Sequence, residues 1–332
     1  MKKTIILFIL MLSVHLHADV ERRAAIDIGS GGTKVAIGDV DTETNQILQV
    51  VLDTSFPVAY QASLDKSIDS TFDEQTQQKG IEVFSEIKAL ANEYQVQNIA
   101  AIATSAFRKA VNAKEFAEQV QAQTGIFIQI IPQKQEGEIA YFSALATGEF
   151  EPQEMVVWDI GTGSLQLTTA NEEDELSVFM GEQMGSVAFK SYIIKMIQEN
   201  DVQEKPSPNP ISEEELRIAD SYARAFARKA PAIIKQKIRN QSSVVGIGRL
   251  FYNSIRPIAA ENGVITRKGL RDFIRNSLNK TDAELNNPFA DLDVTNCILA
   301  LAMMKALHIH EVHPIETTTT RGLLVAPAYW QN

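Results

Sequence analysis

The feature that most constrains the fold is a glycine-rich motif that occurs twice. The first copy reads Asp27-Ile-Gly-Ser-Gly-Gly-Thr33, and the second, 132 residues later, reads Asp159-Ile-Gly-Thr-Gly-Ser-Leu165. Each copy follows one apolar strand-like segment and precedes another, so the pattern predicts two copies of one architectural unit. Either copy alone is typical of any tight turn between strands, whereas the matched pair favours a shared binding function.

The chemistry of such a turn suits phosphate. Glycine allows positive φ and carries no Cβ, so backbone N–H groups in the turn can approach phosphate oxygens closely. An aspartate at the strand end, with a serine or threonine beside it, can hold a hydrated Mg²⁺ that bridges to those oxygens. Two facing hairpins of this kind would form a phosphate-binding cleft.

The segments around the first motif alternate between strand and helix patterns. Three short segments with glycine or asparagine at their joins predict an antiparallel meander over residues 24–28, 34–40 and 47–52. Beyond them the pattern predicts, in order, a helix over 72–94, a strand over 98–103, a helix over 113–123, a strand over 126–131 and a helix over 135–146. Pro132 predicts the end of the last of these strands.

The same order begins again after residue 150. The pattern predicts strands over 155–160, 165–170, 176–180 and 243–247, and helices over 186–198, 212–239 and 291–308. Ser212 and Glu215 have the spacing of a capping box, which predicts a helix start at that point. The proline-rich segment 205–210 is interpreted as a surface loop. The whole order predicts an α/β fold whose sheets are covered by helices.

The first eighteen residues are interpreted as a cleaved secretory signal. Lys2 and Lys3 precede an apolar run over residues 4–14, and Ala18 ends the segment before acidic residues begin. We therefore expect a periplasmic or secreted protein without a stable membrane anchor. The apolar run is short for a bilayer span, and an uncleaved anchor stays the alternative.

The charge of the chain bears on its binding partners, and its cysteine content bears on disulfide bonds. Beyond residue 18 the chain has 29 basic residues against 42 acidic ones, a formal net charge of −13, and no basic run is dense enough to neutralise a nucleic-acid backbone. We therefore expect no nucleic-acid partner. Cys297 is the only cysteine in the sequence, so it forms no internal disulfide and is expected to fill the core.

Further motifs follow the two glycine turns in a fixed order. They are Ala103-Thr-Ser-Ala-Phe-Arg108 with Asn112 and Phe116, Thr124-Gly-Ile-Phe-Ile-Gln-Ile-Ile131 with Glu136, Gly246-Ile-Gly248, and the closing Arg321-Gly-Leu-Leu324. As a set, these motifs resemble the exopolyphosphatase/guanosine pentaphosphate phosphohydrolase (Ppx/GppA) family, which shares its fold with actin, sugar kinases and Hsp70 ATPases. The resemblance covers nearly the whole chain beyond residue 18.

The resemblance implies a fold and a set of residue roles. It implies two actin-like, ribonuclease H-like domains with a ligand cleft between them, over 19–140 plus 317–332 and over 141–316. Glu136 matches the family's helix-borne glutamate, which orients or deprotonates the attacking water. Arg108 matches a phosphate-binding arginine, although an arginine that caps a strand has the same sequence pattern. Asp159 would hold Mg²⁺. The implied phosphate-binding residues are Asp27, Gly29, Ser30, Ser105, Gly161, Thr162, Gly163, Ser164 and Gly248.

Several positions depart from the family pattern. Leu165 and Gln166 stand where the family has a threonine and a glutamate, and an amide oxygen brings no net charge to a metal. Glu138 stands where the family has an arginine. Gly31 and Gly32 replace the more usual asparagine and serine.

Three functional hypotheses follow from the resemblance and its departures. The leading one is an exported Mg²⁺-dependent hydrolase that releases terminal phosphate from inorganic polyphosphate or a related phosphoanhydride. The alternatives are a catalytically degenerate member, which binds polyphosphate or a nucleotide as a sensor or scaffold, and a phosphotransferase. Because the chain is acidic, each needs a locally positive cleft. The candidate sources of that charge are Lys34, Arg108, Lys109, Arg249 and Arg321. The oligomeric state stays open and includes a homodimer.

Two remaining clusters keep alternative interpretations. His308, His310 and His313 have the composition of a metal site, but an expected strand start and the following Pro314 favour a structural role. The run of four threonines over 317–320 fits either a phosphate-facing turn or a plain helix N-cap.

Overall fold

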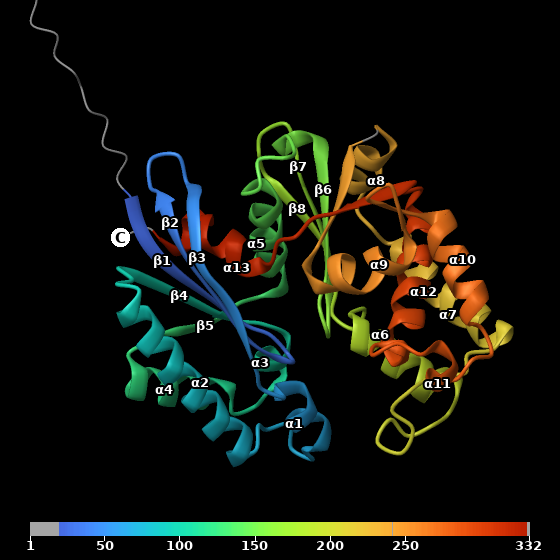
Figure 1. Cartoon of the computed structure of the whole chain (residues 1–332), viewed down its shortest axis with the longest axis horizontal. Helices are drawn as coiled ribbons and strands as arrows, with labels where there is room; N and C mark the ends of the chain where they lie inside the picture. The colour runs from blue at the N-terminus through green and yellow to red at the C-terminus, as the bar shows by residue number, and fades with distance from the viewer. Residues whose placement is uncertain (1–19, 241, 331–332) are drawn as a thin grey trace, which may run out of the picture.

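Two β-sheets, each with its own helices, organise the molecule (Figure 1). The computed structural model describes residues 20–240 and 242–330, so the expected signal segment over 1–18 lies outside the described residues. We call each sheet with its helices a lobe, the first lobe being the one nearer the N-terminus. The expected α/β class, with mixed sheets flanked by helices, is confirmed.

The first lobe is built on a five-stranded sheet. Its strands lie in the order β3 (Gln46–Pro57), β2 (Gly32–Asp41), β1 (Val20–Ile28), β4 (Asn98–Ala103) and β5 (Ile128–Ile130). β1 pairs antiparallel with β2 and parallel with β4. The predicted meander is confirmed, and each of its strands extends beyond the apolar segment because backbone pairing continues through polar residues.

Four helices accompany the strands of the first lobe. They are α1 (Tyr60–Lys66), α2 (Glu74–Glu93), α3 (Ser105–Lys109) and α4 (Ala113–Thr124). The predicted helices over 72–94 and 113–123 are confirmed as α2 and α4, and α2 begins late because the Asp73 carboxylate caps it by accepting from the Thr76 N–H. The sequence pattern missed α1 and α3, which are too short to show a helical period.

The second lobe is built on a seven-stranded sheet. Its strands lie in the order β10 (Ala260–Glu261), β11 (Val264–Thr266), β12 (Glu311–Pro314), β9 (Ser243–Ile247), β6 (Met155–Ile160), β7 (Leu165–Ala170) and β8 (Leu176–Gly181). β6 pairs antiparallel with β7 and parallel with β9, as β1 pairs with β2 and β4. The predicted duplication is therefore confirmed in the sheet topology.

The helices of the second lobe correct two predictions. They are α6 (Ser186–Tyr192), α7 (Glu213–Ala227), α8 (Ala232–Arg239), α9 (Arg256–Ala259), α10 (Arg267–Ser277), α11 (Asp282–Leu285) and α12 (Ala290–Leu307). The single helix predicted over 212–239 is wrong, because Pro231 has no N–H to continue α7 and instead caps α8. The helix predicted over 186–198 continues past α6 as a π-helix, Ile193–Ile197. The capping box of Ser212 and Glu215 is confirmed.

Two helices lie between the sheets and join the lobes. Figure 1 shows α5 (Gln133–Leu145) and α13 (Thr319–Val325) in this position. α5 packs against β6, β7 and β8, and α13 packs against α5, β1 and β2. A Cβ on Gly322 would lie 2.2 Å from the Ile139 carbonyl oxygen, so this glycine permits the close contact between α13 and α5.

Several side chains for which the sequence suggested no chemical role pack in the apolar interior. Trp158, Cys297, Met303 and Met304 all belong to the core of the second lobe, as expected. Within residues 20–240 and 242–330, no helix combines the length and the apolar character needed to cross a membrane.

Candidate active site

The two glycine turns share one internal hydrogen bond. The Gly29 N–H donates to the Gly32 carbonyl at 2.9 Å, and the Gly161 N–H donates to the Ser164 carbonyl at 2.9 Å. The duplicated sequence therefore folds into a duplicated turn, one at the end of β1 and the other at the end of β6.

The turns face each other where the lobes meet. A Cβ on Gly163 would lie 2.7 Å from Ser105 Oγ and 3.5 Å from Ser30 Oγ, so the second turn closely approaches α3 and the first turn. The Thr104 N–H donates to the Ile28 carbonyl at 3.0 Å, which holds the start of α3 against the end of β1. Residues from both turns and from α3 thus form one site.

Gly248 closes the site on the side of the second lobe. It has a positive φ of 82°, and a Cβ there would lie 3.1 Å from Asp159 Oδ1. Its N–H donates to the Thr317 carbonyl at 3.0 Å. Glycine is therefore required at this position for backbone conformation and for the approach to Asp159.

Glu136 enters the site from the first turn of α5. Its Oε2 accepts a hydrogen bond from Arg108 Nη1 at 3.0 Å, and its Oε1 lies 3.4 Å from Ser164 Oγ, which donates to it. Arg108 Nη1 also donates to the Ile131 carbonyl at 3.2 Å. Arg108 therefore fixes the Glu136 carboxylate and also binds the chain just beyond β5, while its expected contact with phosphate stays a prediction.

Two side chains hold Asp27 in place. The sequence indicated Lys34 only as a source of positive charge, and it did not single out Thr319. Asp27 Oδ2 accepts from Lys34 Nζ at 3.1 Å and from Thr319 Oγ1 at 2.5 Å. Lys34 lies directly opposite Asp27 in the pairing of β1 with β2. Thr319 begins α13, and the run of threonines there was the only sequence signal for it.

Negative charge accumulates around Asp159. Burial, followed by the nearby Glu136 carboxylate, raises the pKa of Asp159 to about 7, while Lys34 opposes the rise. Burial also raises the pKa of Glu136, against the lowering effect of Arg108. Asp27 adds to the rise at both carboxyl groups. Such shifts are typical of sites that bind a cation or move a proton.

The oxygen atoms at this point fit a hard divalent cation. Asp159 pairs in register with Gln166 on the adjacent strand, and Gln166 Oε1 is buried without a hydrogen-bond partner. Ser30 Oγ is likewise buried and unpartnered. Among the described residues no group of three His, Cys, Asp or Glu side chains forms a protein cage for a metal. Mg²⁺ is commonly bound by one or two carboxylates, with water and substrate phosphate completing its coordination.

Comparison with known proteins places the chain in a family. The model of the Ppx/GppA phosphatase family matches residues 39–328. The chain belongs to the Ppx/GppA phosphatase family.

Solved structures of Ppx/GppA proteins share the fold. The Ppx/GppA family member of Aquifex aeolicus superposes with a TM-score of 0.73 at 19% identity, over 93% of this chain and 98% of that chain. An exopolyphosphatase from Cytophaga hutchinsonii gives a TM-score of 0.71 at 15% identity, over 92% and 97%. A nucleoside triphosphate hydrolase from Neospora caninum gives 0.61 at 9% identity, over 94% and 93%. The expected two-domain actin-like Ppx/GppA architecture is therefore confirmed.

Most residues that the Ppx/GppA resemblance singled out meet in one place. The contacts and charge interactions above bring together Asp27, Ser30, Ser105, Arg108, Glu136, Asp159, Gly163, Ser164 and Gly248. Gly29 and Gly161 close the two turns. The Thr162 carbonyl accepts from the N–H groups of Val187 and Ala188, at 3.0 and 3.2 Å, and so holds the start of α6.

The histidine cluster lies elsewhere and is structural in its contacts. His313, on β12, has its Nε2 3.4 Å from Glu311 Oε1, and its ring packs edge-on against Phe150. His308 ends α12 in the left-handed conformation.

Proposed function

We propose that the chain hydrolyses the terminal phosphoanhydride bond of inorganic polyphosphate. The observation that carries this proposal is the position of Glu136, a buried carboxylate fixed by Arg108 beside the second of two facing glycine turns. A carboxylate in that place can accept a proton from water while the turns hold the phosphoryl group that the water attacks.

The protein's part in the reaction is to position the groups and to take up a proton. Backbone N–H groups of the turns and the Arg108 guanidinium would bind the terminal phosphate. The oxygen of a water molecule forms a bond to the terminal phosphorus, and the bond from that phosphorus to the bridging oxygen breaks. The water proton passes to Glu136, and the bridging oxygen leaves on the shortened chain. Orthophosphate is the second product.

We propose Mg²⁺ as the cation of this site. Asp159 and Asp27, with the unpartnered Gln166 Oε1, are the oxygens that would hold it. When bound, Mg²⁺ neutralises charge on the phosphate oxygens and on the leaving group. It would also offset the excess of carboxylates that raises the pKa of Asp159.

Export and substrate choice belong together in this proposal. If residues 1–18 direct the chain to the periplasm or outside the cell, it is separated from the nucleotide pool of the cytoplasm, which favours inorganic polyphosphate or a related phosphoanhydride as the substrate. A catalytically degenerate member that binds polyphosphate without turnover is the second candidate. The observation that favours it is Gln166, an uncharged amide at the place opposite Asp159 where the family pattern has a carboxylate.

Phosphate release from polyphosphate by the purified chain with Mg²⁺ tests the proposal. We expect Glu136→Gln to slow release by about 10²- to 10⁴-fold, the usual effect of removing a general base. Glu138→Gln is the matched control, because Glu138 lies on the same helix but pairs with Lys134 at its surface. Equal release by the parent and Glu136→Gln excludes Glu136 as the base. No release by the parent, together with tight polyphosphate binding, supports the second candidate.

A further inference from the structure

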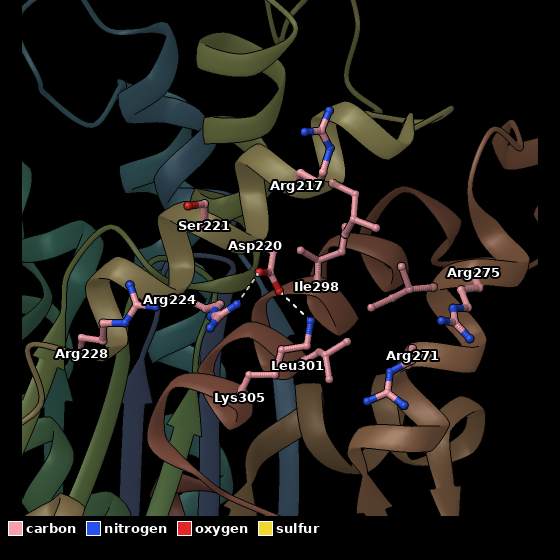
Figure 2. A pocket seen from close by; sticks show the side chains of 12 residues that line it. Arg217, Asp220, Ser221, Arg224, Arg228, Arg271, Arg275, Ile298, Leu301 and Lys305 are labelled. Carbon is pink, nitrogen blue, oxygen red and sulfur yellow. Dashed lines mark hydrogen bonds and ion pairs between the residues drawn. The ribbon is translucent and has the colours of Figure 1, made fainter.

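The second lobe contains a cavity with a marked excess of positive charge. The cavity has a volume of about 430 Å³ and lies among α7, α10 and α12 (Figure 2). Six basic side chains line it, namely Arg217, Arg224, Arg228, Arg271, Arg275 and Lys305. Asp220 is the single acidic residue of the lining. This concentration of cations stands against a formal net charge of −11 for the whole chain.

Asp220 neutralises only part of that charge. Its carboxylate accepts from Lys305 Nζ at 3.0 Å and lies 3.5 Å from Arg224 Nη1. Arg224 Nε is buried and has no hydrogen-bond partner. An unpaired buried donor costs free energy, but this nitrogen has almost no accessible surface, so a ligand in the cavity would contact other atoms of the Arg224 guanidinium.

The opposite wall carries cations without counter-charges. Figure 2 shows Arg271 and Arg275 on α10, across the cavity from Asp220 and Arg224. Within the described part of the chain, no carboxylate lies at ion-pair distance from Arg271 or Arg275. Arg271 and Arg275 are exposed to solvent, which screens their mutual repulsion, but an anion between the two walls would be attracted to several guanidinium groups at once.

The cavity also has an apolar component. Leu216, Ile274, Ile298 and Leu301 contribute to its lining, and Ile298 and Leu301 are nearly fully buried. A ligand that fills it therefore meets guanidinium groups on two sides and aliphatic side chains between them. Guanidinium groups bind phosphate oxygens in a two-pronged arrangement, and aliphatic side chains favour an apolar body.

We propose that this cavity binds an organic polyphosphate, a molecule with adjacent phosphate groups and an apolar or aromatic body, at a site separate from the glycine turns. None of its lining residues belongs to the candidate active site. In Figure 1, α7 and α10 lie on the side of the second lobe that is turned away from the first lobe. The inferred site therefore does not depend on the proposed hydrolysis.

Calorimetric titration tests this site, with adenosine triphosphate and inorganic tripolyphosphate as probes and Glu136→Gln as the parent to prevent turnover. We expect the double variant Arg271→Gln with Arg275→Gln to bind adenosine triphosphate at least about 10-fold more weakly, because it loses two charge-assisted contacts. Lys268→Gln with Arg239→Gln removes the same charge from outside the cavity and should leave affinity unchanged. Asp220→Asn should tighten binding, since it frees Lys305 and Arg224.

A second background separates this site from the active site. Arg108→Gln alters the glycine-turn site alone, so the cavity should still bind adenosine triphosphate in that variant. Loss of all binding in Arg108→Gln, or full binding in the Arg271 and Arg275 double variant, would overturn the proposal. Adenosine triphosphate should bind more tightly than tripolyphosphate. Equal affinities would refute the role of the apolar lining and assign the cavity to inorganic polyphosphate.

Discussion

Asp159 lies among more negative than positive side chains, and burial removes the water that would otherwise screen them. The ordinary pKa of an aspartate is 3.8, and that of Asp159 in the folded protein is raised to about 7. Between these two pH values the folded state therefore holds a proton that the unfolded state has released. Without a cation, the Asp159 contribution to stability is therefore greatest at low pH and declines as pH rises through about 7. A metal ion would replace the proton in this role.

Asp159→Asn tests this linkage, because asparagine has no proton to lose. In the presence of a chelator, we expect the variant to gain stability relative to the parent by about 2 kcal/mol between pH 5 and pH 8. Thermal unfolding at the two pH values measures the change. Mg²⁺ should raise the melting temperature of the parent and not that of the variant. A constant difference between the two proteins across this pH range would contradict the assignment.

Gln166 tests whether the departure from the family pattern weakens the cation site. We expect Gln166→Glu to raise Mg²⁺ affinity by about 10-fold, since it places a carboxylate opposite Asp159 in the strand pairing. The same change should lower the stability of the metal-free protein, because it adds a buried charge. Titration calorimetry with Mg²⁺ measures the affinity. Gln129→Glu, on the exposed side of β5, serves as the control and should change neither quantity.

At the scale of elements, the second glycine turn is kept in place by the start of α6. A Cβ on Gly185 would lie 2.4 Å from Ser164 N, 2.5 Å from the Gly163 carbonyl carbon and 2.6 Å from the Thr162 carbonyl oxygen. These are backbone atoms, which cannot rotate away as a side chain can. The position of the turn therefore depends on a glycine outside the turn itself.

Gly185→Ala is expected to displace the second turn and to reduce phosphate release by at least about 10-fold. Overpacking of this kind also costs about 1–3 kcal/mol of stability. Gly31→Ala is the matched control, because a Cβ on Gly31 meets nothing within 4 Å. Phosphate release and thermal unfolding, measured on both variants, give the comparison. Unchanged release by Gly185→Ala would show that the turn tolerates displacement or has no part in the reaction.

The helices and strands that the sequence predicted well are those with long apolar patterns. α2, α4, α5 and α12 follow their predicted ranges to within a few residues. The prediction of one long helix over 212–239 was wrong. The helical spacing of apolar residues continues across Pro231, but the backbone cannot stay helical there because proline has no N–H to donate. The sequence pattern missed α1 and α3 because a helix of one or two turns is too short for the spacing of its apolar residues to show a helical period.

At the scale of the whole molecule, the apolar clusters of the two lobes hold the fold together without covalent links. Cys297 is fully buried on α12, and burial raises the pKa of its thiol well above the ordinary value. The boundaries expected for the two domains stay a prediction. The sheet order shows only that the chain passes between the lobes through α5 and again after β12.

Cys297 should therefore react with a thiol reagent only when the protein unfolds. We expect the modification rate under native conditions to follow global unfolding, and we expect reductant to leave the melting temperature unchanged. A colorimetric thiol assay in buffer and in denaturant measures both states. Rapid modification of the folded protein would mean that α12 opens locally, contrary to its position in the core.

The sequence by itself determined the parts of this protein that depend on near neighbours. The alternation of strands and helices, the two turns and the capping box at Ser212 all arise from hydrogen bonds and apolar patterns within a few residues. The sequence also predicted the duplicated architectural unit, because two segments with similar sequences form similar local structure.

The tertiary structure alone decided which residues the candidate site brings together. Asp27 meets Thr319 across 292 residues of chain. Glu136 on α5 meets Arg108 on α3 and Ser164 in the second glycine turn. The cations of α7, α10 and α12 likewise gather around one cavity only in the fold. Coulombic interactions and burial depend on distance through space and on the exclusion of water, and neither is a function of separation along the chain.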